Sequence, residues 1–295
     1  MELLLKASVS VALESGTAKA SSLERVSVDT TVQPKAIAYP TDSQLFLKAL
    51  CALVRQAKKH GLVLRQSHTR LAKTAALMAA RYAHAKQFGR MRREVKKLRT
   101  YLGRVLRDVR RKIAGNEELE ARFARLLDLA HRLYLQKPKD KNKLYALHTP
   151  EVACIAKGKA RTPYEFGCKV GIATTNREGL VLAATVFEGN PYDGHTLEQT
   201  VRQAVAISSV EPKRLYVDRG YRKHDYTGKA NVFISGQKRG LSPTIRRELK
   251  RRSAIEATIG HMKNDGRLDR NFLLGKQGDA INAIKSVENP MIGQP

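Results

Sequence analysis

The feature that most constrains this chain is a run of apolar residues spaced by three and four positions between residues 88 and 133. Such spacing is typical of amphipathic α-helices, and Gly115-Asn116 interrupts it. We therefore predict two antiparallel helices joined by a short turn and packed by heptad-like contacts. Their apolar seam is expected to be internal packing rather than a dimer zipper. The residues of the seam are Phe88, Met91, Val95, Leu98, Leu102, Val105, Val109, Ile113, Leu119, Phe123, Leu126, Leu127, Ala130 and Leu133.

This helical region also carries most of the chain's positive charge. The 295 residues include 55 Lys and Arg against 27 Asp and Glu, a net charge of +28. Between Ser43 and Lys143 there are 27 basic and seven acidic residues, so this segment holds +20 of the total. An excess of this size predicts a polyanionic partner, with nucleic acid first and an anionic membrane surface second. We predict a surface that follows phosphates, and no membrane span, because no apolar run approaches the roughly 20 residues that one needs.

The N-terminal residues and the cysteines indicate the compartment. The N-terminus is apolar, but it has Glu2 where a signal peptide is basic, and Lys6 interrupts its apolar run. We therefore expect no signal peptide. Cys51, Cys154 and Cys168 are odd in number and lack metal-ligand spacing, so they are interpreted as reduced thiols of a cytosolic protein.

Several short segments are predicted to form a sheet. Residues 23–32 alternate β-branched and polar side chains and place Asp29 opposite the valines, where it is either an exposed edge charge or a functional group. Residues 164–175 and 180–187 predict a β-hairpin, followed by a turn at 190–194 and a helix at 196–207. A strand at 214–217 ends at Asp218, another covers 231–234, and a basic loop covers 236–240. The predicted fold class is α/β, a mixed sheet flanked by helices.

The segment 245–264 is predicted to be one helix that carries Arg252, Glu256 and Lys263. These three residues are spaced by four and seven positions, so they project from one side of the helix. An apolar stripe would pack the helix onto the protein. The spacing alone also fits a solvated basic helix with an internal ion pair. The stripe consists of Leu249, Ile255, Ile259 and Met262.

Together, Asp29, Asp218 and Glu256 could form a metal site. Ligands of open α/β sheets gather at the carboxyl ends of strands, where Asp218 is predicted to lie. Two sheet aspartates and a glutamate on a packed helix could hold two Mg²⁺ ions, which prefer oxygen ligands. A pair of metal ions about 4 Å apart would activate an attacking oxygen and stabilise a leaving one.

A series of motifs, in this order along the chain, resembles the DDE transposases of bacterial insertion sequences, in particular the insertion-sequence-five group. The resemblance covers about residues 10 to 284. The matching stretches are Asp29-Thr30-Thr31-Val32-Gln33-Pro34-Lys35, Tyr39-Pro40-Thr41-Asp42-Ser43, Lys159-Ala160-Arg161-Thr162-Pro163-Tyr164-Glu165-Phe166-Gly167, Gly189-Asn190-Pro191-Tyr192-Asp193-Gly194-His195-Thr196, Val217-Asp218-Arg219-Gly220-Tyr221, Gly236-Gln237-Lys238-Arg239-Gly240, and the helix with Arg252, Glu256 and Lys263.

The resemblance implies a ribonuclease-H-like fold with a long basic helical insertion after its first strand. It assigns Asp29, Asp218 and Glu256 as a catalytic triad that binds Mg²⁺, for which Mn²⁺ can substitute. Strand cleavage at transposon ends would be followed by strand transfer into target DNA. The residues assigned to DNA binding are Arg252, Lys263, Lys238, Arg239 and Arg219. The partners implied are double-stranded DNA and a second copy of the chain, in the bacterial cytoplasm at the nucleoid.

On this basis we expect four segments. Residues 1–42 form a tail and the first catalytic strand, and residues 43–143 form the basic helical insertion. Residues 144–285 complete the catalytic domain, and residues 286–295 form an irregular tail.

Three departures from the family pattern keep other interpretations open. Leu249 stands where the family usually has Tyr, only 28 residues precede Asp29, and residues 286–295 do not resemble the usual terminal helix and strand. The chain therefore resembles a truncated or frame-disrupted copy. The main alternative is a DNA-binding remnant without catalysis, and another is a different ribonuclease-H-like nuclease such as a resolvase. His195 is interpreted as a helix-start residue and Asp42 as a helix N-cap, and Asp193 is not assigned to the site.

Overall fold

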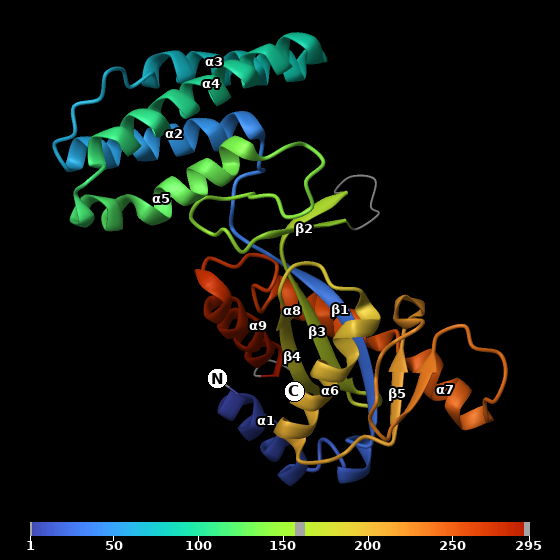
Figure 1. The fold of residues 1–295 in the computed structure, drawn as a ribbon. Coiled ribbons are helices and arrows are strands. Elements are labelled where there is room, and N and C mark those ends of the chain that lie inside the picture. The colour runs from blue at the N-terminus through green and yellow to red at the C-terminus, as the bar shows by residue number, and fades with distance from the viewer. Residues whose placement is uncertain (1, 157–162, 292–295) are drawn as a thin grey trace. The chain divides into compact units, whose positions relative to one another are not determined.

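The computed structural model describes residues 2–156 and 163–291, with side chains described as far as residue 287. The chain forms two compact units (Figure 1). One unit comprises residues 1–36 and 151–295 and contains the sheet, and it is called the sheet unit below. The other comprises residues 37–150 and is called the helical unit. Residues Lys159 to Thr162 of the third family-like stretch lie outside the described residues.

Within the described residues the sheet has six strands, and its centre is β1 (Arg25–Pro34). β1 pairs antiparallel with β3 (Tyr164–Thr175) on one side and parallel with β5 (Arg214–Val217) on the other. β2 (Ala153–Ala156) and β4 (Val181–Phe187) both pair with the edge of β3 that faces away from β1. On the other side of the sheet, β6 (Asn231–Ile234) pairs parallel with β5. The sheet is therefore mixed, as predicted, and the predicted β3–β4 hairpin is confirmed.

The first strand and its neighbours follow the apolar pattern of the sequence. Val26, Val28 and Val32 of β1 are buried in the core of the sheet unit. β2 was not predicted, because it is a four-residue edge strand within a stretch that has the composition of a linker.

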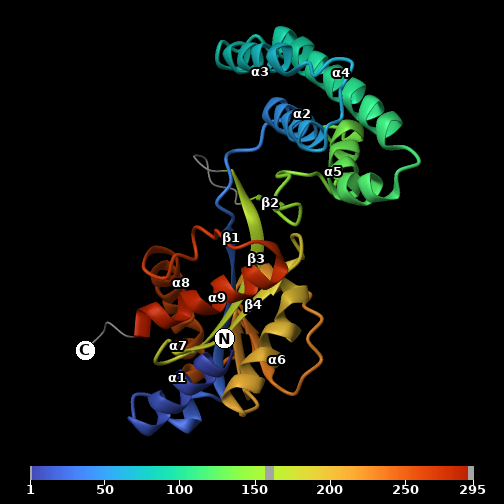
Figure 2. The same cartoon turned by 90° about the vertical axis from the view of Figure 1, so that its left-hand side faces the viewer.

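Helices cover both faces of this sheet. α6 (Leu197–Ser208) lies on one face and α8 (Ala254–Asn264) on the other, as the two views show (Figures 1 and 2). α9 (Gly275–Met291) packs beside α8 and against β4, and α1 (Glu2–Glu14) packs against α6 and α9. The described residues also form three short 3₁₀ turns. η1 (Ala20–Ser22) precedes β1, η2 (Asp193–Thr196) leads into α6, and η3 (Arg219–Tyr221) follows β5.

The predicted single helix over 245–264 is wrong in one respect, because the structure has two helices there. α7 (Pro243–Arg251) is followed by its C-cap Arg252, and α8 begins after its N-cap Ser253. At this junction the backbone hydrogen bonds run from Ile255 to Arg252 and from Glu256 to Ser253, which is 3₁₀ rather than α-helical geometry. Both junction residues keep right-handed backbone angles. Arg252 and Glu256 therefore remain on one side of the chain.

The helical unit consists of α2 (Asp42–Lys59), α3 (Thr69–His84), α4 (Phe88–Ile113) and α5 (Glu117–Leu135). The turn at Gly115-Asn116 is confirmed, and the Asn116 side chain caps α5. The predicted seam from Leu98 to Ile113 is buried within the chain, which confirms internal packing. α4 also packs against α2 and α3, so the predicted hairpin is half of a larger helical cluster.

Two details of the helical unit differ from the predictions. Phe88 was assigned to the seam, but it is the first residue of α4, where packing ends, and is 53% exposed. Asp42 is not the N-cap of α2. Thr41 takes that position and accepts a hydrogen bond from the Gln44 N–H, while the Asp42 carboxylate lies 3.8 Å from Lys143.

The end of the chain also differs from the prediction. Residues 286–291 were expected to be irregular, but they continue α9. Ala283, Ile284 and Val287 are buried at helical spacing and hold this helix on the core. Residues 292–295 lie outside the described part of the chain.

Two predictions about the chain as a whole can be compared with the structure. None of the helices in residues 2–156 and 163–291 has the length and hydropathy that a membrane crossing needs. Cys51, Cys154 and Cys168 are free thiols, as predicted. Burial raises the pKa of Cys168 to about 12, which keeps it a thiol.

Candidate active site

The site is built around Asp29, in the middle of the central strand. The parallel ladder of β1 and β5 pairs Ser27 with Tyr216, and Asp218 directly follows the last residue of β5. Two residues further along each strand, Asp29 and Asp218 stand level with one another. The register of neighbouring parallel strands therefore brings together two acids that are 189 positions apart in the numbering.

The Asp29 carboxylate is held by two donors. Its Oδ1 accepts a 2.8 Å hydrogen bond from the Thr30 N–H, and its Oδ2 lies 3.2 Å from a guanidinium nitrogen of Arg252. The pKa of Asp29 is raised to about 6, chiefly because the carboxyl group is buried; the negative charges of Asp218 and Asp193 also raise it, while the Thr30 N–H and Arg252 lower it. A carboxyl group with this pKa loses its proton near neutral pH, and a bound cation would favour the ionised form.

Asp193, which the sequence analysis left out of the site, is the third acid near Asp29. Its Oδ1 accepts hydrogen bonds of 2.8 Å from the Thr30 hydroxyl and of 2.8 Å from the Lys169 ammonium. Lys169 also donates to the Pro191 carbonyl at 2.6 Å, which fixes the loop before η2. Asp193 belongs to one of the family-like stretches, and that was the only signal for it in the sequence.

Gly220 separates Asp218 from Asp193. A methyl group on this glycine would lie 2.8 Å from Oδ1 of Asp218 and 2.9 Å from Oδ2 of Asp193. Asp218 itself caps η3 by accepting a hydrogen bond from the Gly220 N–H. The two carboxylates thus approach the same backbone position, and only glycine leaves room for both.

Glu256 is connected to the aspartates through Arg252. The guanidinium of Arg252 lies 3.6 Å from Glu256 and 3.2 Å from Asp29. The Arg252 side chain is 11% exposed, whereas that of Glu256 is 68% exposed. Arg252 was predicted to bind DNA, but here it bridges two of the three predicted catalytic acids.

The structure places the predicted acids in one region without closing them into a metal cage. Among the described residues, no three His, Cys, Asp or Glu side chains lie close enough together to hold a metal ion. The cations Arg252 and Lys169 occupy carboxylate oxygens of Asp29 and Asp193. The acids of the site supply carboxylate oxygens, which are the ligands that Mg²⁺ prefers. Binding with three ligands would require Glu256 to leave Arg252.

The remaining predicted DNA-binding residues lie in η3, in the loop between β6 and α7, and on α8. Lys238 and Arg239 are exposed in the loop between β6 and α7, and Lys263 is half-buried near the end of α8. Arg219 is exposed and packs over Gly236, where a methyl group would lie 2.8 Å from its Nε. His195 lies in η2 just before α6, at the helix start as predicted, and pairs with Asp225 at 2.7 Å.

Replacing Asp29 with Asn should stabilise the protein relative to wild type at pH 7. At acid pH this gain in stability should be lost. The folded-state pKa of Asp29 is raised from 3.8 to about 6, so the folded protein binds more protons than the unfolded chain between these values. Wild-type stability therefore falls as pH rises through this window. A shift of this size, which already includes the effect of Arg252, corresponds to about 3 kcal/mol, so we expect a gain of about 3 kcal/mol at pH 7.

This gain would be measured by urea unfolding of both proteins at pH 3.5 and pH 7. Asp225→Asn, which removes an exposed carboxylate, is the control and should change stability by less than about 1 kcal/mol at pH 7. Equal stability differences at both pH values would contradict the raised pKa of Asp29.

Residues 136–284 match the family model described as "Transposase DDE domain". The match covers half of the chain, and the protein belongs to this family. Asp218 and Glu256 lie inside the matched region, whereas Asp29 precedes it.

One curated relative is the "Uncharacterized protein ORF8 in nfe locus" of Rhizobium meliloti, which is 73% identical over 88 residues. The similar stretch covers 30% of this chain and 42% of the relative, so the chain spans less than half of the relative's length. No solved structure matches the chain.

Proposed function

We propose that this protein is a DNA transposase that cleaves DNA strands at transposon ends and transfers them into target DNA with the help of Mg²⁺, for which Mn²⁺ can substitute. The observation that carries the proposal is the placement of Asp29 and Asp218 side by side on parallel strands, with Glu256 joined to Asp29 through Arg252. The family membership supports the same reaction. The protein would act as a homodimer on double-stranded DNA of the nucleoid, in the bacterial cytoplasm.

The proposal includes a ribonuclease-H-like catalytic domain. The mixed sheet with helices on both faces is compatible with such a fold. The helical unit follows β1 directly in the chain, so we assign α2–α5 as the basic insertion, in keeping with the expected segment 43–143. Residues 144–285 would complete the catalytic domain.

Asp29, Asp218 and Glu256 would hold the metal ions through carboxylate oxygens. Bound divalent cations would activate the attacking oxygen and stabilise the leaving oxygen of the phosphodiester. Arg252 keeps Asp29 oriented and lowers its pKa, and on release of Glu256 it would be free to pair with a DNA phosphate. Thr30 and Lys169 hold the Asp193 carboxylate near Asp29, where its charge adds to the negative potential of the site.

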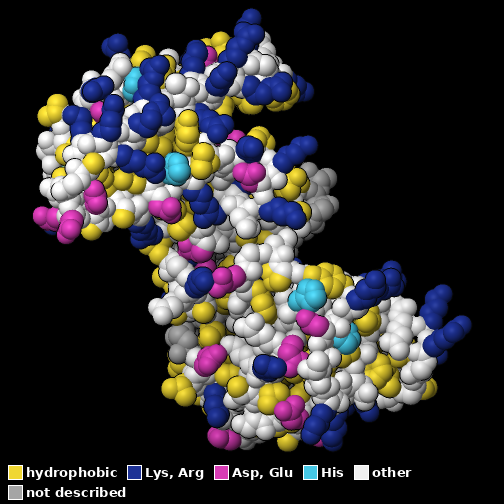
Figure 3. Space-filling view, viewed as in Figure 1, with side chains coloured by type: hydrophobic (Ala, Val, Ile, Leu, Met, Phe, Trp, Pro, Cys, Tyr) yellow, Lys and Arg dark blue, Asp and Glu magenta, His cyan; other side chains and the backbone are white. Residues whose placement is uncertain are grey.

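The surrounding cations would hold the DNA. Lys238, Arg239 and Arg219 are exposed, and with Lys263 and Arg252 they supply positive charge beside the acids. Figure 3 shows Lys and Arg side chains spread over the helical unit, which carries most of the chain's net charge. We expect DNA affinity to fall steeply as salt increases, because bound phosphates release counterions.

The test is nicking of a labelled DNA duplex by the full chain in Mg²⁺, in Mn²⁺ and in EDTA. We expect nicking with either metal, none in EDTA, and loss of nicking in Glu256→Gln. Because the Glu256 side chain is 68% exposed, the Gln variant should fold normally, and an unchanged melting temperature would check this. Nicking that persists in Glu256→Gln would overturn the assignment of Glu256.

A second candidate function is DNA binding without cleavage. It is favoured by the ion pair between Arg252 and Glu256 and by the lack of a closed three-ligand group among the described residues. In that case the wild-type chain would bind DNA with the same salt dependence but would not nick it with either metal.

A further inference from the structure

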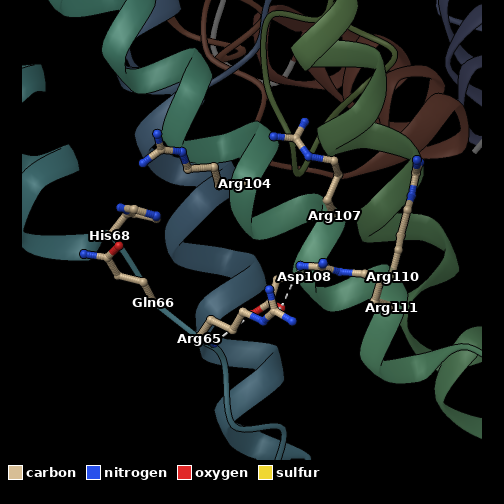
Figure 4. A pocket seen from close by; sticks show the side chains of 8 residues that line it. All are labelled: Arg65, Gln66, His68, Arg104, Arg107, Asp108, Arg110 and Arg111. Carbon is tan, nitrogen blue, oxygen red and sulfur yellow. Dashed lines mark hydrogen bonds and ion pairs between the residues drawn. The ribbon is translucent and has the colours of Figure 1, made fainter.

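The helical unit contains a basic pocket that shares no residue with the site described above. The pocket has a volume of about 550 Å³, and we call it the arginine pocket (Figure 4). Three of its residues come from the segment before α3, and five come from α4. The lining residues are Arg65, Gln66, His68, Arg104, Arg107, Asp108, Arg110 and Arg111. We propose that the arginine pocket binds phosphate groups of a double-stranded DNA backbone. That the anion is DNA rests on the proposed function.

The charge of the pocket is unbalanced. Five arginines face one aspartate, so the lining carries a net charge of +4. Arg104, Arg107 and Arg111 stand three and four positions apart on α4, so they share one face of the helix and repel one another. A bound anion would relieve this repulsion.

Asp108 positions residues of the pocket and neutralises only part of the pocket's positive charge. It is buried, and its Oδ2 accepts a 2.8 Å hydrogen bond from the backbone N–H of Arg65. Its Oδ1 lies 3.3 Å from the Arg111 guanidinium. The Arg65 side chain approaches the same carboxylate oxygen (Figure 4). Asp108 thus ties the segment before α3 to α4 and sets the position of two arginines. Among the described residues, Arg104, Arg107 and Arg110 form no ion pair, so their guanidinium groups remain available.

His68 adds a buried polar atom that lacks a partner. The residue is 6% exposed, stacks on Tyr101 at 5.0 Å, and holds a left-handed backbone conformation with φ of 55°. Its Nδ1 has no hydrogen-bond partner among the described residues. Burial lowers the pKa of His68, as does the positive charge of Arg104, so the ring is neutral near pH 7 and one of its nitrogens can donate. Buried polar groups normally have partners, so this nitrogen is left for a water or a ligand group that enters the pocket.

The chemistry of the lining selects phosphate. Guanidinium groups present paired donors that match phosphate oxygens, and Gln66 and His68 add neutral donors. The arginines are exposed at the surface, where a large polyanion can reach them. The excess charge of the helical unit attracts a polymer of phosphates more strongly than a single small anion. A DNA backbone therefore fits the pocket better than free phosphate does.

The test compares three proteins for binding to a fluorescein-labelled DNA duplex of random sequence, by fluorescence anisotropy in EDTA. They are wild type, the pocket variant Arg104→Gln/Arg107→Gln, and the control variant Arg93→Gln/Lys96→Gln. The control removes the same charge from exposed positions of the same helix outside the pocket. EDTA excludes metal-dependent steps, so the result is independent of cleavage.

We expect the pocket variant to bind DNA at least about tenfold more weakly than wild type, since a hydrogen bond to a charged group contributes about 1.5 kcal/mol. The control should bind more tightly than the pocket variant. A second pair, Arg104→Lys/Arg107→Lys, keeps the charge but removes the paired donors, and it should also weaken binding. It tests the proposal even if the Gln variant fails to fold.

Three results would overturn the proposal. Equal weakening of the pocket and control variants would mean general electrostatics rather than a pocket. A rise of melting temperature with inorganic phosphate in wild type alone, with DNA affinity unchanged in the pocket variant, would assign the pocket to a free anion. No DNA binding by wild type would overturn both this proposal and the proposed function, whereas DNA binding without nicking would leave the pocket intact.

Discussion

Replacing Asp218 with Asn should abolish metal-dependent strand cleavage by this protein while DNA binding is retained. Asp218 stands level with Asp29 at the end of β5, where its carboxylate is proposed to bind the metal ions. Loss of a group that only supports a metal ligand lowers activity by about 10–100-fold, so loss of a ligand should lower the cleavage rate by more than about 100-fold. DNA affinity should stay the same or rise, because a negative charge is removed from a surface that binds phosphates.

The measurement pairs nicking in Mg²⁺ with anisotropy in EDTA for the same preparations. Asp225→Asn is the matched control, since it removes a carboxylate that is paired with His195 and half-exposed. It should nick DNA at the wild-type rate. Equal loss of binding and cleavage in Asp218→Asn would contradict the metal-ligand role and would indicate damage to the fold.

Removing Asp279 should have the largest effect on stability. The Asp279 carboxylate is 6% exposed and accepts a hydrogen bond from the Lys35 ammonium, which is 3% exposed. It also accepts a 2.6 Å hydrogen bond from Asn271. Asp279→Ala would leave the buried Lys35 with only Glu151, at 3.4 Å, as an acidic partner. Breaking a buried ion pair in this way costs about 3 kcal/mol of unfolding free energy.

Urea unfolding of Asp279→Ala and of Lys276→Ala would check this. Lys276 lies on α9, as Asp279 does, and forms an exposed ion pair with Glu188, so its loss should cost less than about 1 kcal/mol. The double variant Lys35→Met/Asp279→Leu removes both buried charges and should recover most of the lost stability. A double variant as unstable as Asp279→Ala would show that packing, not the unpaired ammonium, is responsible.

The local features of the fold could be predicted from the sequence. The strand around Asp29, the hairpin of β3 and β4, and the turn at Asn116 depend on neighbouring residues, whose side-chain alternation and caps act over a few positions. The break between α7 and α8 could not be predicted from the sequence. Arg252 and Ser253 keep ordinary right-handed backbone angles, and only the backbone hydrogen bonds change from α-helical to 3₁₀ at this point.

The candidate site was predicted in part. Asp29, Asp218 and Glu256 were chosen from a strand pattern and a family resemblance, and their roles remain predictions. Asp193 was left out because its partner Thr30 is 163 positions away. Arg252 was assigned to DNA, although it contacts Asp29, which is 223 positions away. Contacts over such distances depend on strand register and helix packing, which leave no local pattern.

The sequence by itself determined the class of fold, the basic character of the helical unit and the acids to consider, because these depend on composition, short-range periodicity and motif order. Only the tertiary structure decided which charges meet. It placed Arg252 between Asp29 and Glu256, Lys35 against Asp279, and His68 among the arginines of α4. The physical reason is that burial and distance determine the strength of these charge interactions, and both are set by packing between segments that are remote in the chain.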